Sequence, residues 1–240
     1  MSYTLVLAVG FVAGTVSGIV GTGATIILLP ILVYGFGPRE AVPIMAIVAL
    51  MSNFAKITSW WKEIDWRACA AYALGGIPGA ALGARTLLIL PEQLINIALG
   101  LFFLVMVPGR RWLATRNLKL GRGGLVLAGA VIGFLTGIVV STGPLSVPAF
   151  TAYGLTKGAF IATEAAGSLA LYISKALTFR QFGALPVDIV LKGLISGSSV
   201  MAGTYTARLI VERLSVDTFQ RLLDGVMIVA GIALLWAAFR

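Results

Sequence analysis

The chain has 240 residues, of which 59% are hydrophobic and only 11% are charged. This balance lies far from that of a soluble domain and predicts an integral membrane protein. Eighteen Lys and Arg stand against nine Asp and Glu, mostly in short loops, so nucleic acid is not an expected partner. Histidine is absent, which removes the usual bases and metal ligands, and we expect no enzyme, no cofactor and no metal.

The first apolar run extends from Leu5 to Tyr34. It is too long for one upright crossing, because about 20 helical residues span the hydrocarbon core. Small residues recur in it about one helical turn apart, which allows another backbone to approach closely. The sequence Gly21-Thr22-Gly23 then interrupts the run. We therefore expect a longer and a shorter helical piece joined by a break, and no removable signal peptide before them.

Further apolar runs follow in a repeating order. The first half continues with spans over residues 41–58, 68–90 and 94–107. The next segment, 108–124, carries five basic residues and no acid, which predicts a cytoplasmic connector. The second half then runs through residues 125–153, with a break of its own, and through 159–179, 187–207 and 219–239. We expect residues 1–107 and 125–240 to be two homologous transmembrane repeats joined by the connector 108–124.

The two halves align at an offset of 119 residues, which supports an internal duplication. Gly14 then matches Gly133, and Lys56 matches Lys175. The predicted fold is an all-α, polytopic helical bundle of two halves, each with about four helical segments. Each half begins with a broken segment, which either crosses the membrane or enters and returns. Crossing segments give parallel repeats and re-entrant segments give inverted repeats, and the loop charges do not decide between them.

The two breaks are the first candidate substrate-binding residues. Interrupted apolar segments at matching places in two halves are the best sequence indication of a transporter's binding site. The backbone N–H groups at the start of a second helical piece favour an anion, and hydroxyl groups add donors. The alternative is that the hydroxyls only bond to their own helix. The candidates are Gly21, Thr22, Gly23, Ser141, Thr142 and Gly143.

Lys56 and Lys175 are the second set of candidates, because they occupy equivalent positions late in a long apolar run. There they can supply positive charge to a bound anion. A lysine near a helix end can instead extend to the lipid headgroups. Ser52, Asn53 and Tyr172 lie within a turn of the lysines and extend the same polar surface.

Glu164 lies inside the run 159–179, whereas most other acids stand at or near loops. An intramembrane carboxylate is a candidate for proton coupling or for a counter-ion. The alternative is an interfacial carboxylate, or one paired with Lys157. Asp224 lies three residues after Arg221 and is expected to pair with it on one helix face.

Several of these features together resemble the TauE/SafE family of sulfite and organosulfonate exporters. They are the duplicated small-residue helix, the break, the proline before a Tyr-Gly turn, the sequence Pro38-Arg-Glu-Ala41 and the basic connector. The resemblance covers nearly the whole chain. In that family the first break is commonly richer in glycine; here Ala24 and Thr25 stand there, and the second copy has Pro144. These departures bear on substrate identity more than on fold.

The resemblance implies a secondary transporter of small sulfur-containing anions, such as sulfite, sulfoacetate or related organosulfonates. It would work by alternating access, in the direction of export, as a multi-pass protein of the bacterial inner membrane. Its partners would be the anion, the lipid bilayer and, as an option, a second copy in a homodimer. An anion channel and a membrane-embedded enzyme are the alternatives.

Overall fold

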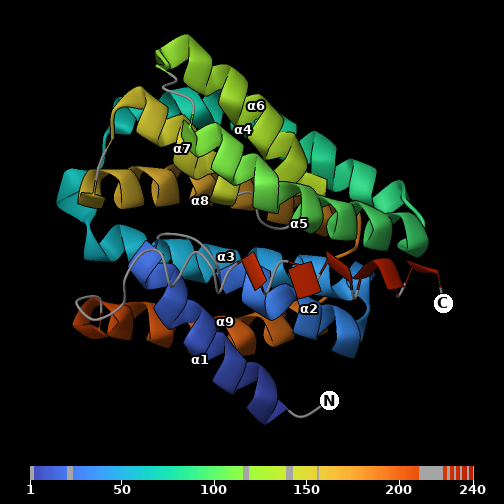
Figure 1. Ribbon diagram of the computed structural model, residues 1–240. Coiled ribbons are helices and arrows are strands. Elements are labelled where there is room, and N and C mark those ends of the chain that lie inside the picture. The colour runs from blue at the N-terminus through green and yellow to red at the C-terminus, as the bar shows by residue number, and fades with distance from the viewer. Residues whose placement is uncertain are drawn as a thin grey trace.

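The computed structural model describes residues 3–20, 24–115, 119–138, 143–155 and 157–210, and part of 224–239. The described residues form helices and no strand, so the predicted all-α bundle is confirmed (Figure 1). In chain order the helices are α1 (Tyr3–Val20), α2 (Ala24–Phe36), α3 (Pro38–Ser59), the short 3₁₀ helix η1 (Trp61–Glu63), α4 (Trp66–Ile89), α5 (Glu92–Thr115), α6 (Arg122–Ile138), α7 (Gly143–Tyr153), α8 (Lys157–Gln181) and α9 (Val187–Ile210).

The helix lengths match the apolar runs closely. Three helical stretches of the described chain are long and apolar enough to cross a membrane: Pro38–Ser59, Trp66–Ile89 and Glu92–Gly109. The long and short pieces expected in each broken segment are α1 with α2 and α6 with α7. The connector differs from the prediction, because α5 continues through Pro108 to Thr115 and α6 begins at Arg122, so more than half of the segment 108–124 is helical.

Local signals explain where several helices begin. Asp65 caps α4, since its carboxylate accepts hydrogen bonds from the backbone N–H groups of Arg67 and Ala68 at 2.9 and 3.1 Å. Gly37 separates α2 from α3 with a φ of 76°, a backbone conformation that residues other than glycine rarely adopt. The tight turn at Gly37 brings the start of α3 back beside the end of α2.

Glycine permits two close helix pairs, α1 with α9 and α4 with α6. A Cβ atom at Gly14 would collide with the carbonyl of Val200, and one at Gly129 would collide with the carbonyl of Tyr72. Such contacts of backbone with backbone are how small residues pack helices inside a membrane. Each pair joins the first helix of one half to a later helix of the other half.

The order of contacts gives the direction of the helices. Along α1 and α9, Gly10 faces Ser199 and Gly18 faces Thr204, so the two helices run parallel. Helices α3 and α9 are also parallel, because Lys192 bonds to Glu40 at one end and the Tyr205 hydroxyl meets that of Thr58 at 2.9 Å near the other. Since α1 and α3 both run with α9, the chain must return between them through α2.

The helices of the second half have the same relative directions. Helix α8 is parallel to α4: the Asp65 N–H donates to the Thr163 hydroxyl at 2.9 Å, and further along the Ser174 hydroxyl donates to the Ile77 carbonyl at 2.8 Å. Helix α6 is also parallel to α4, with Gly75 facing Val126 and Gly83 facing the carbonyl of Phe134. Therefore α7 returns between α6 and α8. Both broken segments are hairpins that re-enter, and the sequence halves have inverted orientations.

This arrangement assigns a side to each loop. The connector shares its side with η1 and with the turn between α7 and α8, and the turns at residues 90–91 and 182–186 lie opposite. Lys62, Arg67 and Lys157 thus lie on the connector's side. By the positive-inside rule we expect that side to face the cytoplasm.

We predict that single cysteines at Lys62 and Lys119 label from the cytoplasmic side and that one at Phe182 labels from the other side. All three residues are exposed. The measurement is reaction with a membrane-impermeant maleimide in oriented vesicles, with the buried Cys69 replaced by serine. If position 182 labels from the same side as position 119, the broken segments cross and the re-entrant arrangement is wrong.

Candidate functional site

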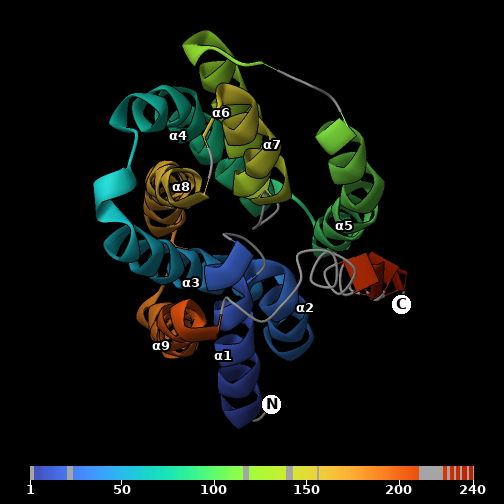
Figure 2. The ribbon, with the colours of Figure 1, turned by 60° about the vertical axis from the view of Figure 1, so that its left-hand side comes forward.

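A polar face runs along α8 through the middle of the protein. Glu164, Ser168, Tyr172 and Lys175 are spaced four, four and three residues apart, which places them on one side of the helix. All four are buried. Figure 2 looks almost along α8, which lies between α4 on one side and α3 on the other. The polar face is therefore enclosed by protein rather than turned to lipid.

Glu164 is 4% exposed and is held by two hydroxyl groups. Ser168, one turn further along α8, donates a hydrogen bond to Oε1 at 2.8 Å. Ser146, in the first turns of the re-entrant helix α7, donates to the same oxygen at 2.9 Å. A carboxylate buried in a membrane protein is stable only with such partners. Glu164 thus links the second hairpin to the centre of the bundle.

Helix α3 brings three predicted residues to the same region. Ser52, Asn53 and Lys56 are all buried, Lys56 being 6% exposed. Ile57, next to Lys56, packs with Ala162 and Ala165 of α8 in one apolar cluster. The turn that carries Lys56 therefore lies beside the turn that carries Glu164.

Lys175 lies at the far end of the polar face, about 16 Å along the helix axis from Glu164 at 1.5 Å per residue. Its side chain is 0% exposed. The ammonium donates a hydrogen bond to the carbonyl of Thr136 at 2.6 Å and lies 5.4 Å from the ring centroid of Phe179. Thr136 belongs to the last turn of α6, where the helix dipole favours a cation. Neither lysine reaches the protein surface in this structure.

The two lysines lie near opposite ends of the α3–α8 pair. Each belongs to the C-terminal part of its helix, and α3 and α8 run in opposite directions. Lys175 turns toward α6, where its ammonium donates to the carbonyl of Thr136.

The polar face is not symmetric, although the lysines are. At the offset of 119 residues, Glu164 corresponds to Met45 and Ser168 corresponds to Ala49. Met45 is fully buried in the apolar core around α3. The carboxylate is thus present in one half and absent from the equivalent position of the other.

Three polar residues at the site were not predicted as site residues. Tyr72 of α4 is fully buried beside Glu164 and Ser168, with its ring 4.8 Å from that of Phe150. Ser146 follows the second break by only a few residues, and that proximity was its only sequence signal. Ser168 lies one helical turn after Glu164, which was its only sequence signal. A tyrosine inside an apolar span has no pattern that separates a binding residue from a packing residue.

The break residues lie largely outside the described part of the chain. This holds for Gly21, Thr22, Gly23, Ser141 and Thr142, whereas Gly143 begins α7. Ser52 Oγ is buried without a hydrogen-bond partner among the described residues, and it lies one turn before Lys56 on α3. An unpaired buried hydroxyl is unusual and is a natural contact for a ligand.

A second buried carboxylate stands in the last part of the chain. Asp224 is 5% exposed. Its expected partner, Arg221, lies outside the described residues. Sequence reasoning placed this acid in a pair and gave it no further role.

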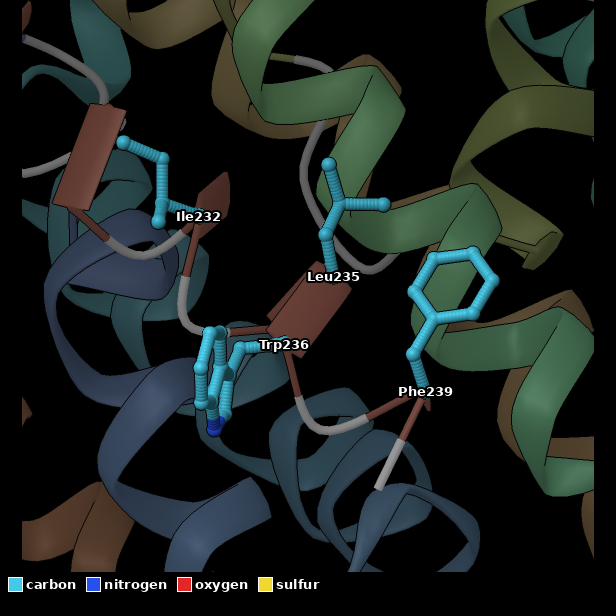
Figure 3. A pocket seen from close by; sticks show the side chains of 4 residues that line it. All are labelled: Ile232, Leu235, Trp236 and Phe239. Atoms are coloured by element: carbon cyan, nitrogen blue, oxygen red, sulfur yellow. The ribbon is translucent and has the colours of Figure 1, made fainter.

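A surface pocket on the last helical stretch has a different character. Ile232, Leu235, Trp236 and Phe239 line it, and their side chains project toward α5 and α2 without a polar group among them other than the indole nitrogen (Figure 3). Among these four residues the indole N–H is the one side-chain donor, and none of them carries a charge that would bind an anion. Within the described residues, no group of three or more Cys, Asp or Glu side chains gathers where a metal could bind.

Comparison with known proteins gives the family. The family model of the sulfite exporter TauE/SafE matches residues 6–234. The probable membrane transporter protein YunE of Bacillus subtilis (strain 168) is 20% identical over 117 residues, 44% of this chain and 43% of the relative. A probable membrane transporter protein of Xylella fastidiosa (strain Temecula1 / ATCC 700964) is 27% identical over 118 residues, 45% of each. The match covers less than half of each relative, and no solved structure matches.

The family match extends over almost the entire chain, and it agrees with the apolar helices and with the resemblance that the sequence motifs carry. The chain is a multi-pass membrane protein and belongs to the sulfite exporter TauE/SafE family of transporters.

Proposed function

We propose that this protein is a secondary transporter that moves small sulfur-containing anions, such as sulfite, sulfoacetate or related organosulfonates, by alternating access. The family is named for sulfite export, so export across a bacterial inner membrane is the proposed direction and place. The relatives' names support transport in general. The proposal includes assembly of the protein as a homodimer.

The burial of two equivalent lysines is the observation that carries the proposal. An ammonium inside a membrane protein costs much free energy and is found where it has a function. Lys175 of the polar face is fully buried, and Lys56 of the neighbouring α3 is nearly so. A sulfite or sulfonate group would bind such cations through charge-assisted hydrogen bonds. Its several oxygens would also accept from hydroxyl donors such as Ser52 and Tyr172.

The inverted hairpins fit alternating access. In transporters with inverted repeats, the substrate lies between the halves, near broken helices, and one half rocks against the other. The proposed binding set follows that pattern: Gly21, Thr22, Gly23, Ser52, Asn53, Lys56, Ser141, Thr142, Gly143, Tyr172 and Lys175, with Glu164 for proton coupling.

The two alternatives make different demands. An anion channel would conduct without saturation and would not exchange one substrate molecule for another. A membrane-embedded enzyme would need a nucleophile and a base; the described polar face offers hydroxyls, lysines and the Glu164 carboxylate, and the chain contains no histidine. Saturable exchange in liposomes therefore separates the carrier from both.

The direct test is a panel of labelled sulfite, thiosulfate, sulfonates and carboxylates offered to proteoliposomes. We expect saturable uptake of sulfur-containing anions, and acceleration when the same anion is present on the other side. Uptake of carboxylates alone would assign another substrate class. Uptake that never saturates would identify a channel.

Lys56→Ala and Lys175→Ala are predicted to weaken anion binding roughly tenfold to a hundredfold, because each removes a charge-assisted contact. Equilibrium binding of labelled sulfite to the purified variants measures the effect. Lys→Met at the same positions controls for lost volume. Lys192→Ala controls for the loss of a positive charge elsewhere. Lys192 lies away from the polar face and pairs with Glu40, its Nζ 2.8 Å from Oε2. Unchanged affinity in both alanine variants would remove the lysines from the site.

Glu164→Gln is predicted to retain exchange of substrate across the membrane and to lose acceleration by a pH gradient. Glutamine keeps the shape of the side chain and an oxygen that can accept from Ser146 and Ser168, but its amide does not ionise and so cannot take up and release the coupled proton. Counterflow and gradient-driven flux in the same liposomes separate the two properties. A glutamine variant that the proton gradient still drives normally would exclude Glu164 from coupling.

A further inference from the structure

The helices group in space into two units that differ from the two sequence halves. Figures 1 and 2 show α4, α6, α7 and α8 together in the upper part of the molecule and α1, α2, α3 and α9 together in the lower part. The upper group forms the middle unit, built from residues 66–89 and 122–181, and the lower group forms the end unit, built from residues 3–59 and 187–210. Helix α4 of the first half thus lies in the middle unit, and α9 of the second half lies in the end unit.

Direct contact between backbones holds each unit together. In the end unit, a Cβ atom at Gly203 of α9 would collide with the carbonyl of Phe11 of α1. In the middle unit, a Cβ atom at Gly133 of α6 would collide with the carbonyl of Gly76 of α4. Two backbones in contact have no side chains between them that could repack, so each of these helix pairs can move only as one piece.

Hydrogen bonds fix α3 and α8 to their own units. In the end unit, the hydroxyl of Thr58 on α3 lies 2.9 Å from that of Tyr205 on α9. In the middle unit, the Ser174 hydroxyl of α8 donates to the Ile77 carbonyl of α4 at 2.8 Å. Each of these bonds joins helices from different sequence halves.

The crossing of α3 and α8 forms the interface between the units, and its packing is of another kind. Helix α3 contains no glycine, and neither glycine of α8 faces it. Side chains meet there instead, with Ile57 of α3 in one apolar cluster with Ala162 and Ala165 of α8. An interface made of side chains can change between discrete packings through small sliding movements of its helices.

Among the described residues, the chain passes from one unit to the other at two linkers. Residues 60–65, which include η1, join α3 to α4 on the connector's side, and residues 182–186 join α8 to α9 on the opposite side. The two linkers are equivalent in the duplication, since each joins the third helix of its half to the fourth. Gly183 in the second linker has a φ of 72°. Short segments at the ends of helices are where hinge movements are absorbed.

We propose that alternating access occurs by rocking of the middle unit against the end unit about the α3–α8 crossing, with residues 60–65 and 182–186 as hinges. The inference rests on the proposed function, because it identifies the moving parts of that transporter. The sequence halves would then not be the moving parts. Lys56 moves with the end unit, whereas Glu164 and Lys175 move with the middle unit, so the proposed binding set is divided between the two.

The test measures distances between pairs of spin labels in lipid nanodiscs by pulsed electron paramagnetic resonance. The labels are attached to cysteines at exposed positions of four helices, with Cys69 replaced by serine: Leu5 on α1, Ile89 on α4, Leu177 on α8 and Leu191 on α9. The pair 5–89 belongs to one sequence half but to different units. The pairs 5–191 and 89–177 each belong to one unit but to different halves.

We expect the 5–89 distance distribution to be broad or double without any anion and to shift when sulfite is added. The distributions for 5–191 and 89–177 should be narrow and should stay unchanged. Rocking of the sequence halves predicts the reverse for all three pairs. A 5–89 distribution that is as narrow and constant as the other two, or a change confined to the other two, would overturn the proposal.

Cross-linking tests the same units through transport. The pair Ile77→Cys/Ser174→Cys joins α4 to α8 inside the middle unit, and the pair Ile57→Cys/Ala162→Cys joins α3 to α8 across the interface. With a short reducible cross-linker, we expect the first pair to keep saturable sulfite exchange and the second to lose it until reductant is added. Exchange that survives the α3–α8 cross-link, or that is lost in the α4–α8 control, would overturn the proposal. Absence of sulfite exchange in the unmodified protein would count against the proposed function alone, because the label distances test the units without any anion.

Discussion

Close approach between backbones is the constraint on which the bundle depends. Where α1 meets α9 and α4 meets α6, glycine lies directly against a carbonyl of the opposite helix, as at Gly14 and Gly129. Lipid gives little hydrophobic force for helix association, so tight packing must supply it. The outer helix faces remain apolar, with Leu74, Val105 and Leu127 largely exposed. These contacts hold the first helix of each hairpin against a full-length helix, and the polar face of α8 is enclosed as a result.

The enclosed face combines two kinds of lysine environment. Lys175 is satisfied by the last turn of α6, and Lys56 lies beside the carboxylate that Ser146 and Ser168 hold. Ser146 belongs to a re-entrant helix, so movement of that hairpin would change the contacts of Glu164 directly. The charges and the parts proposed to move are therefore connected through single hydrogen bonds rather than through a long chain of residues.

Most of the fold was predictable from sequence because apolar length and its interruptions follow directly from the thickness of a bilayer. The offset that pairs Lys56 with Lys175 also led to the buried lysines. The direction of the broken segments was not predictable, since both arrangements leave acceptable loop charges and only contacts such as Lys192 with Glu40 decide between them. Tyr72 was not predictable as part of the site because its neighbours come from α7 and α8, far along the chain.

The first helix of each half packs against a helix of the other half, and this has a consequence for biogenesis. Gly14 and Val200 touch although 186 residues separate them, so α1 enters the membrane long before its partner has been synthesised. Meanwhile α4 and α6, which are close in sequence, can pair as soon as both are made. Contacts between distant segments form late because the loop between them must first be ordered. The N-terminal hairpin would therefore remain incompletely packed until α9 has been synthesised. It is the segment that would depend most on a membrane chaperone.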